Sequence, residues 1–129
     1  MKQKYSPMMM QYLGIKEQNK DAIVMFRLGD FYEMFFDDAM IVSKELELAL
    51  TGKNAGAKER VPMCGVPFHS ASGYIQKLVD NEHKVAIVEQ LTDPGKKGIV
   101  ERGVVQIVTP GTIFDESMTK NKKGTGYEI

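Results

Sequence analysis

Residues 25–35 read Met25-Phe-Arg-Leu-Gly-Asp-Phe-Tyr-Glu-Met-Phe35, two short apolar segments that meet at a Gly-Asp pair. Such a pair predicts a tight β-hairpin, because glycine readily takes the positive φ that the turn requires. Side chains alternate along a strand, so Phe31 and Glu33 are expected to share one face of the second strand. Tyr32 and Met34 would lie on the other face. An aromatic ring and a carboxylate near the tip of a hairpin form a candidate binding site.

Two simpler interpretations of this pair are open. Phe31 can be an ordinary half-buried strand residue with Glu33 as its solvated neighbour, or Asp30 and Glu33 can form a helix capping box. The capping box is the weaker interpretation, because bulky aromatic residues crowd the first turn that would follow it. On the residues of this segment alone, the structural interpretations rank above a functional one.

Length and composition predict a single compact domain. Of the 129 residues, 43% are hydrophobic and 26% are charged, as is typical of globular proteins. No apolar stretch is long enough to cross a membrane, the N-terminus does not resemble a signal peptide, and the single cysteine, Cys64, excludes an intrachain disulfide. These features predict a cytoplasmic protein. The 17 basic and 17 acidic residues balance, so any contact with nucleic acid is expected to be local.

Hydrophobic periodicity and turn residues predict an α+β fold, a mixed β-sheet with about three flanking helices. The expected helices cover residues 8–19, 38–48 and 71–81, and the expected strands cover residues 22–28, 31–35, 84–91 and 104–108. Two prolines place residues 61–69 at a sheet edge or in an extended loop, because proline cannot donate a ladder hydrogen bond. Residues 51–60 are expected to form a mobile loop, and Ser70 to cap the third helix.

The sequence offers little for catalysis. His69 and His83 are far apart in the sequence and do not suggest a zinc site, and Cys64 with His69 lacks an identifiable oxyanion device. Asp37 and Asp38 open the second predicted helix, where acids interact favourably with the helix dipole. The same two carboxylates are the basis of one alternative function, a metal-dependent nuclease. The preferred expectation is a chain that is not an enzyme and has no metal or cofactor site.

A longer motif contains the hairpin, Gly29-Asp-Phe-Tyr-Glu-Met-Phe-Phe-Asp-Asp-Ala39. It resembles the signature of the N-terminal, mismatch-recognition domain of the MutS family of bacterial DNA mismatch repair proteins. Four further segments resemble other blocks of that domain in the same order, namely Pro7–Tyr12, Val61–His69, Val88–Gln90 and Val104–Thr112. The resemblance implies a mismatch-recognition domain over residues 1–116, with residues 117–129 as a polar tail or the start of a connector.

The resemblance also implies a mechanism. In this family the phenylalanine of a Phe-x-Glu motif enters the minor groove and stacks on a mispaired or unpaired base, and the glutamate hydrogen-bonds that base; here these would be Phe31 and Glu33. Base–aromatic stacking contributes about 1–3 kcal/mol, and a mismatch is selected because it costs less to unstack and kink. Against an acceptor nitrogen the carboxyl must be protonated, which exclusion of water favours by raising its pKa.

Other DNA contacts are implied less directly. Met63 is near the groove by resemblance, but as an apolar residue it equally suits the core. Two groups of basic residues are expected either to reach phosphates or simply to be solvated. The first group is Lys53, Lys58 and Arg60, and the second is Lys96, Lys97 and Arg102.

The expected partners follow from the same family. Its full-length members also have connector, lever, clamp and ATPase domains and encircle DNA as dimers, so ATP and magnesium are expected to belong to those domains. The expected ligand is mismatched double-stranded DNA, with the other MutS domains and a second subunit as protein partners, in the cytoplasm at the nucleoid. A second alternative function is a protein-interaction module in which Phe31 and Met34 at the hairpin tip dock another protein.

Overall fold

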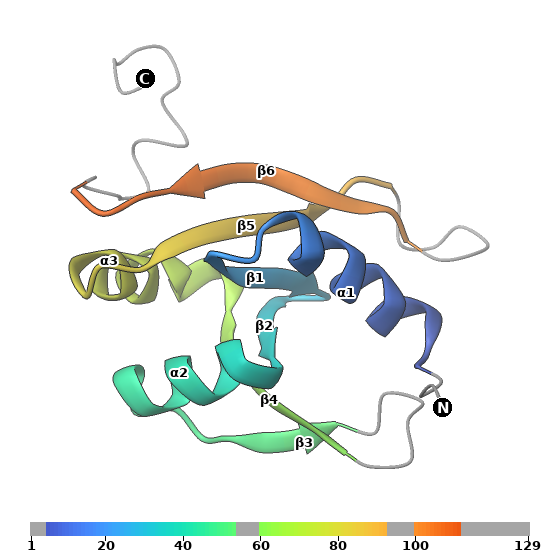
Figure 1. Cartoon of the computed structure of the whole chain (residues 1–129), viewed down its shortest axis with the longest axis horizontal. Helices are drawn as coiled ribbons and strands as arrows, with labels where there is room; N and C mark the ends of the chain where they lie inside the picture. Colours follow the sequence, from blue (N-terminus) through green and yellow to red (C-terminus); the bar gives the residue numbers. More distant parts are fainter. Residues whose placement is uncertain (1–4, 54–59, 93–99, 112–129) are drawn as a thin grey trace.

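The computed structural model describes residues 5–53, 60–92 and 100–111, which form a six-stranded sheet flanked by three α-helices (Figure 1). The predicted α+β fold with a mixed sheet is confirmed. In chain order the elements are α1 (Pro7–Gln18), β1 (Ala22–Leu28), β2 (Phe31–Phe35), α2 (Phe36–Leu46), β3 (Thr51–Lys53), β4 (Val61–Pro67), the 3₁₀ turn η1 (Phe68–Ser70), α3 (Ala71–Asp80), β5 (Lys84–Gln90) and β6 (Arg102–Val108). None of the described helices is long and apolar enough to cross a membrane.

The predicted hairpin lies at the centre of the sheet. The strand order is β3-β4-β2-β1-β5-β6, with β3 and β6 at the two edges (Figure 1). β1 and β5 are parallel, and every other neighbouring pair is antiparallel. The bounds of β1 and β2 are those predicted, and Gly29 has a φ of +63°, as the turn requires. β2 is therefore held by hydrogen-bonded strands on both sides.

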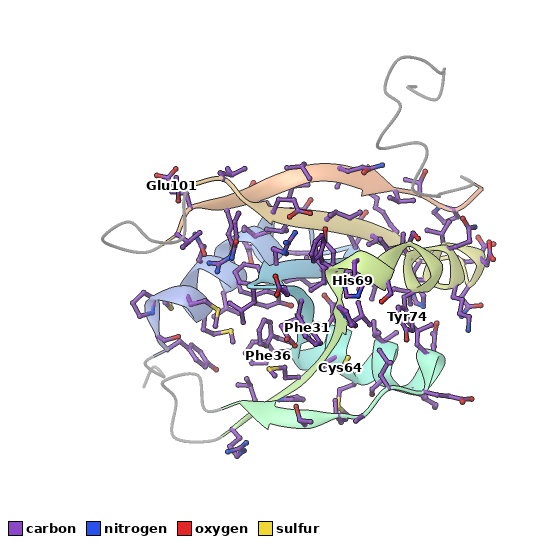
Figure 2. All side chains as sticks on the ribbon, turned by 180° about the vertical axis from the view of Figure 1, so that it is seen from behind. Phe31, Phe36, Cys64, His69, Tyr74 and Glu101 are labelled. Carbon is purple, nitrogen blue, oxygen red and sulfur yellow. The ribbon has the colours of Figure 1, made fainter. Side chains whose placement is uncertain are left out.

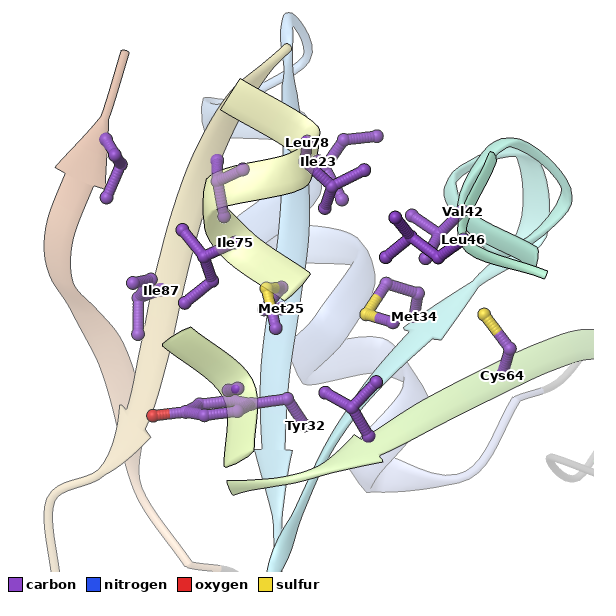
Figure 3. Packing of buried hydrophobic residues seen from close by; sticks show 14 of the residues in the cluster. Ile23, Met25, Tyr32, Met34, Val42, Leu46, Cys64, Ile75, Leu78 and Ile87 are labelled. Carbon is purple, nitrogen blue, oxygen red and sulfur yellow. The ribbon is translucent and has the colours of Figure 1, made fainter. Parts of the chain in front are cut away.

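The two faces of the sheet bury separate apolar clusters. Tyr32 and Met34 of β2 face α2 and α3, where they join a cluster that includes Val42, Ile75 and Leu78 (Figure 3). The residues of β2 that alternate with them face α1, and the last of these, Phe35, packs in a second cluster with Met9, Tyr12 and Phe26. The predicted alternation of faces along β2 is confirmed.

A buried carboxylate joins α1, β1 and α2. Asp38 is only 4% exposed; its Oδ1 is 3.0 Å from the ammonium of Lys16, and its Oδ2 accepts the backbone N–H of Val24 at 3.0 Å. The hydroxyl of Tyr12 lies 3.5 Å from the same Oδ2. Burial, followed by the charge of Asp38, raises the pKa of Tyr12. Asp38 therefore stabilises the fold through specific partners, beyond any interaction with the helix dipole.

The edge position predicted for residues 61–69 is wrong. β4 is an inner strand, paired with β2 on one side and β3 on the other. Its prolines are tolerated because each lies where only one neighbour is paired: Pro62 is opposite Gly52 of β3, beyond the last β2 pair, and Pro67 is opposite Phe31 of β2, beyond the end of β3.

Other details of the predicted elements also differ. Residues 51–53 of the expected loop form β3, and residues 54–59 lie outside the described residues. α2 begins two residues earlier than predicted, at Phe36, which has a φ of +55° and follows β2 directly without a linker. Ser70 does occupy the N-cap of α3, but its side chain makes no capping hydrogen bond, because the turn η1 leads straight into the helix.

Candidate nucleic-acid interface at the hairpin tip

Phe31 is the first residue after the hairpin turn, and it presents an aromatic ring to solvent. It pairs with Leu28 on β1 and Pro67 on β4, and 41% of its surface is exposed (Figure 2). Its side chain is on the α1 face of the sheet, since it alternates with Tyr32 on the opposite face. The backbone that carries this ring is fixed on both sides while the ring itself is accessible.

The side chain of Glu33 lies over Gly65 of β4, the residue directly opposite it in the sheet. A Cβ built on Gly65 would lie 2.4 Å from Oε1, 2.7 Å from Cδ and 2.9 Å from Oε2 of Glu33. Those separations are too short for real contacts, so the carboxylate occupies space that only a glycine leaves open. Glu33 and Phe31 share the α1 face, as predicted.

Met63 joins the same face, because it pairs with Phe35, two residues beyond Glu33 along β2. It is half-buried and packs against the apolar cluster under α1. Met63 thus packs partly against this cluster, and a part of its surface remains exposed beside Glu33. The structure brings Phe31, Glu33 and Met63 together along one side of β2.

On the face of the sheet opposite Phe31, the charged residues Arg27 and Glu89 support the hairpin turn. Nε of Arg27 donates to the carbonyl of Gly29 at 2.7 Å, and Nη1 lies 2.7 Å from Oε1 of Glu89 on β5. The Arg27 guanidinium carbon is 4.0 Å from the centroid of the Phe68 ring. The hydroxyl of Tyr32 donates to the other oxygen of Glu89. Burial, followed by this hydrogen bond, raises the pKa of Tyr32.

Three of the basic residues predicted to reach phosphates are described, and they do not lie together: Lys53 and Arg60 are at the β3–β4 end of the sheet and Arg102 is in β6. Arg60 is exposed, and its Nη2 donates to the carbonyl of Gly52 on β3. Lys53 is the last residue of β3, paired with Val61. Lys58, Lys96 and Lys97, together with the expected tail at 117–129, lie outside the described residues. The structure thus places two residues of the first group, Lys53 and Arg60, at the β3–β4 end of the sheet.

Arg102 is engaged in contacts within the protein. Its Nε donates to the carbonyl of Arg27 at 2.7 Å, its Nη1 donates to Oε1 of Gln11 at 2.5 Å, and its guanidinium carbon is 4.7 Å from the centroid of the Phe26 ring. Burial lowers the pKa of its guanidinium. These contacts tie β6 to β1 and α1, a structural role that the sequence analysis did not assign to Arg102.

The surroundings of Asp38, Cys64 and Met34 do not suit a metal site, a reactive thiol or a docking surface, respectively. Asp38 is buried and bonded, so Asp37 and Asp38 do not present two carboxylates to a metal, and no group of three potential ligands is found among the described residues. Burial, with a smaller effect of the Glu33 carboxylate, raises the pKa of the Cys64 thiol to about 11, which keeps it protonated at neutral pH. Met34 is 1% exposed and cannot belong to a docking tip.

Four residues that surround the site were not among the predicted site residues: Arg27, Glu89, Phe68 and Gly65. One signal was available for Arg27, since it is the only charged residue in the apolar segment 22–28. Neither Gly65 nor Glu89 carried such a signal, because their roles depend on strand pairing between distant segments.

Comparison with known proteins points to one family. The profile of a family described as MutS domain I matches residues 6–117. A protein named DNA mismatch repair protein MutS from Clostridioides difficile (strain 630) is 61% identical over 121 residues, which cover 93% of this chain and 13% of that protein. A protein of the same name from Acetivibrio thermocellus is 62% identical over 119 residues, which cover 92% of this chain and 14% of that protein.

A third relative of that name, from Desulforamulus reducens, is 59% identical over 118 residues, 91% of this chain and 14% of its own length. The chain thus spans about one seventh of the length of the curated relatives that it matches. The match of the family profile over nearly the whole sequence decides the assignment: this chain belongs to the MutS domain I family.

Proposed function

We propose that this chain recognises mismatched base pairs in double-stranded DNA. In this proposal Phe31 wedges between bases from the minor groove and stacks on the mispaired base, and Glu33 hydrogen-bonds that base. The observation that carries the proposal is an exposed phenylalanine at the tip of a central hairpin, next to a carboxylate on the same face, in a chain of the MutS domain I family.

The surroundings of Phe31 suit a wedge. Pushing a side chain into a base step costs a few kcal/mol of unstacking, and stacking on the displaced base returns about 1–3 kcal/mol. A ring on a loose loop would lose part of this return as conformational entropy on binding. The strand pairing of β2 on both sides limits that loss.

The position of Glu33 supports its role as the polar partner. Its carboxylate lies over Gly65, beside the ring that would hold the base. A polar group next to a stacking ring can distinguish bases by their hydrogen-bonding edges, which stacking alone cannot do. Met63 supplies apolar surface on the same side of β2 for contact with sugar or base.

Overall charge supports a local mode of binding. The 17 basic and 17 acidic residues of the chain balance, so phosphate attraction by this chain alone is weak. We therefore expect the 129-residue chain to bind DNA weakly, and strong binding to need the remaining domains and a second subunit of a full MutS protein. This chain would contribute recognition and no catalytic step, ATP and magnesium would act elsewhere in such an assembly, and its setting would be the cytoplasm.

Docking of another protein at the tip is the competing function, because an exposed aromatic residue also suits a protein interface. The two functions predict different ligands and different responses to salt. Binding to DNA weakens steeply as salt increases, whereas apolar docking does not.

The test compares Phe31→Ala with an exposed apolar residue away from the tip, Met40→Ala on α2, which is 50% exposed. Each variant is measured in the 129-residue chain by NMR titration with matched and single-mismatch duplexes. It is also measured in a chimera in which this chain replaces the 121 matched residues of the Clostridioides difficile relative, by fluorescence anisotropy at several salt concentrations.

We expect Phe31→Ala to abolish the preference for the mismatched duplex, with an unchanged circular dichroism spectrum, and Met40→Ala to retain that preference. Loss of stacking worth about 1–3 kcal/mol corresponds to about 5- to 150-fold weaker mismatch binding. A chimera with Phe31→Ala that still prefers the mismatch to the same degree would refute the proposal.

A further inference from the structure

We infer that Arg27 is a positioning residue for Phe31: it ties the hairpin turn to β5 and η1, and so fixes the direction in which the ring points. This inference rests on the proposed function, because positioning matters only if Phe31 enters DNA. It concerns a residue on the opposite face of the sheet from the ring.

Arg27 contacts the hairpin turn and also two other elements, β5 and η1. Its Nε holds the carbonyl of Gly29 at 2.7 Å, inside the turn itself, while Nη1 is 2.7 Å from Oε1 of Glu89 on β5. The ring of Phe68 covers the guanidinium at 4.0 Å. A planar guanidinium can satisfy a carbonyl, a carboxylate and a ring face at once, which a lysine ammonium cannot.

Phe68 and Tyr32 add a second set of contacts to the same turn. The backbone N–H of Phe68 donates to the carbonyl of Asp30 at 2.8 Å, so the residue that covers Arg27 also holds the other residue of the turn. The hydroxyl of Tyr32 donates to Glu89, which keeps that carboxylate directed at Arg27. Both turn residues that precede Phe31 are therefore attached: Gly29 to β5 through Arg27 and Glu89, and Asp30 to η1 through the backbone of Phe68.

These attachments act on Phe31 through the backbone. Phe31 follows Asp30 directly and is opposite Leu28 in the hairpin, so rotation of the turn would carry the ring with it. Pairing of β2 with β1 and β4 fixes the strand, but the turn lies beyond the last pair of both ladders. Arg27 supplies the restraint at the point where strand pairing ends.

The test uses Arg27→Gln, with Glu89→Gln as a second variant that breaks the same ion pair and keeps the shape of the side chain. The control is Lys84→Gln, which makes the same change of charge and breaks the Lys84–Asp21 pair (2.8 Å) at the opposite end of β5. Amide hydrogen exchange of Phe68 in the 129-residue chain reports on the turn, because its N–H donates to Asp30. Mismatch preference is measured in the chimera described above.

Arg27→Gln and Glu89→Gln are expected to speed exchange of the Phe68 amide by about tenfold and to reduce the mismatch preference, and Lys84→Gln to do neither. In the Phe31→Ala background, where the preference is already lost, Arg27→Gln is expected to cause no further change. If Phe31→Ala removes the preference but Arg27→Gln and Glu89→Gln both keep it, the inference fails and the proposed function stands. If Phe31→Ala itself keeps the preference, the proposed function fails.

Discussion

Replacing Gly65 by alanine tests the role of Glu33 without touching Glu33. The new Cβ would lie 2.4 Å from Oε1, and ordinary contact begins at 3.4 Å, so the carboxylate must move by about 1 Å. The backbone need not change, since Gly65 lies in extended β4 and has no positive φ. These contacts are with the end of the flexible Glu33 side chain, so we expect it to rotate while the strands keep their pairing.

A displacement of about 1 Å is enough to break a hydrogen bond, because donor–acceptor distances beyond about 3.5 Å contribute little. If Glu33 bonds the mispaired base, losing a hydrogen bond to a charged group costs about 1.5–3 kcal/mol, or about 10- to 150-fold in mismatch affinity. The assay is anisotropy with matched and mismatched duplexes, using the chimera, and thermal unfolding of the chain in parallel.

Gly14→Ala is the matched control, since a Cβ at that exposed position of α1 meets nothing within 4 Å. It is expected to stabilise the helix by about 0.5–1 kcal/mol and to leave mismatch preference unchanged. In a Glu33→Ala background, Gly65→Ala is expected to have no further effect on that preference. Unchanged preference in Gly65→Ala, with the carboxylate displaced in a crystal structure, would refute the role of Glu33.

Three further substitutions test the stability of the fold, and one of them also tests whether Arg102 contacts a phosphate. Asp38→Ala removes a buried partner of Lys16, which is itself partly exposed, and is expected to lower the free energy of unfolding by about 2–3 kcal/mol in urea titrations; a loss below about 1 kcal/mol would contradict this. A hydrogen bond from His83 lowers the pKa of Glu45 below its usual 4.5, so this carboxylate stabilises the fold above about pH 4.5, and the contribution is lost as pH falls further. Glu45→Gln should therefore reduce the acid-induced loss of stability between about pH 5 and pH 3, and an acid profile identical to that of the unmodified chain would count against the pair. Arg102→Gln is expected to lower the free energy of unfolding by about 1–2 kcal/mol with no change in the salt dependence of DNA binding; a salt slope reduced by about one would instead indicate a phosphate contact.

The hairpin and its alternation of faces were predictable because they depend on neighbouring residues. A Gly-Asp pair fixes the turn locally, and a period of two then assigns Phe31 and Glu33 to the same side. The same local logic predicted the helices to within a few residues.

Features that depend on pairing between distant segments were not predictable. The rule that proline avoids inner strands failed for β4, because it treats a strand as uniformly paired along its length. In fact β2 and β3 overlap β4 at different ends, and each proline faces a single neighbour. The role of Gly65 likewise needs the register that sets it opposite Glu33, about thirty residues away in sequence.

The burial of Asp38 illustrates a different limit. Two acids at the start of a helix are common and are usually solvated, so their sequence position predicts only a dipole interaction. That one of them is enclosed by Lys16, Val24 and Tyr12 follows from how α1 crosses the sheet. Sequence periodicity does not determine that crossing.

The direct passage from β2 into α2 has a mechanical consequence. A load applied to Phe31 along its strand acts in shear on two ladders of hydrogen bonds, to β1 and to β4, and then on a helix that follows without a slack linker. Shear shares a load among many bonds at once, whereas peeling breaks them in turn. Smoothly bending a duplex of about 20–30 base pairs by about 40–90° costs about 1–6 kcal/mol. If DNA presses on the Phe31 ring, we expect the hairpin to keep its shape and the DNA to bend.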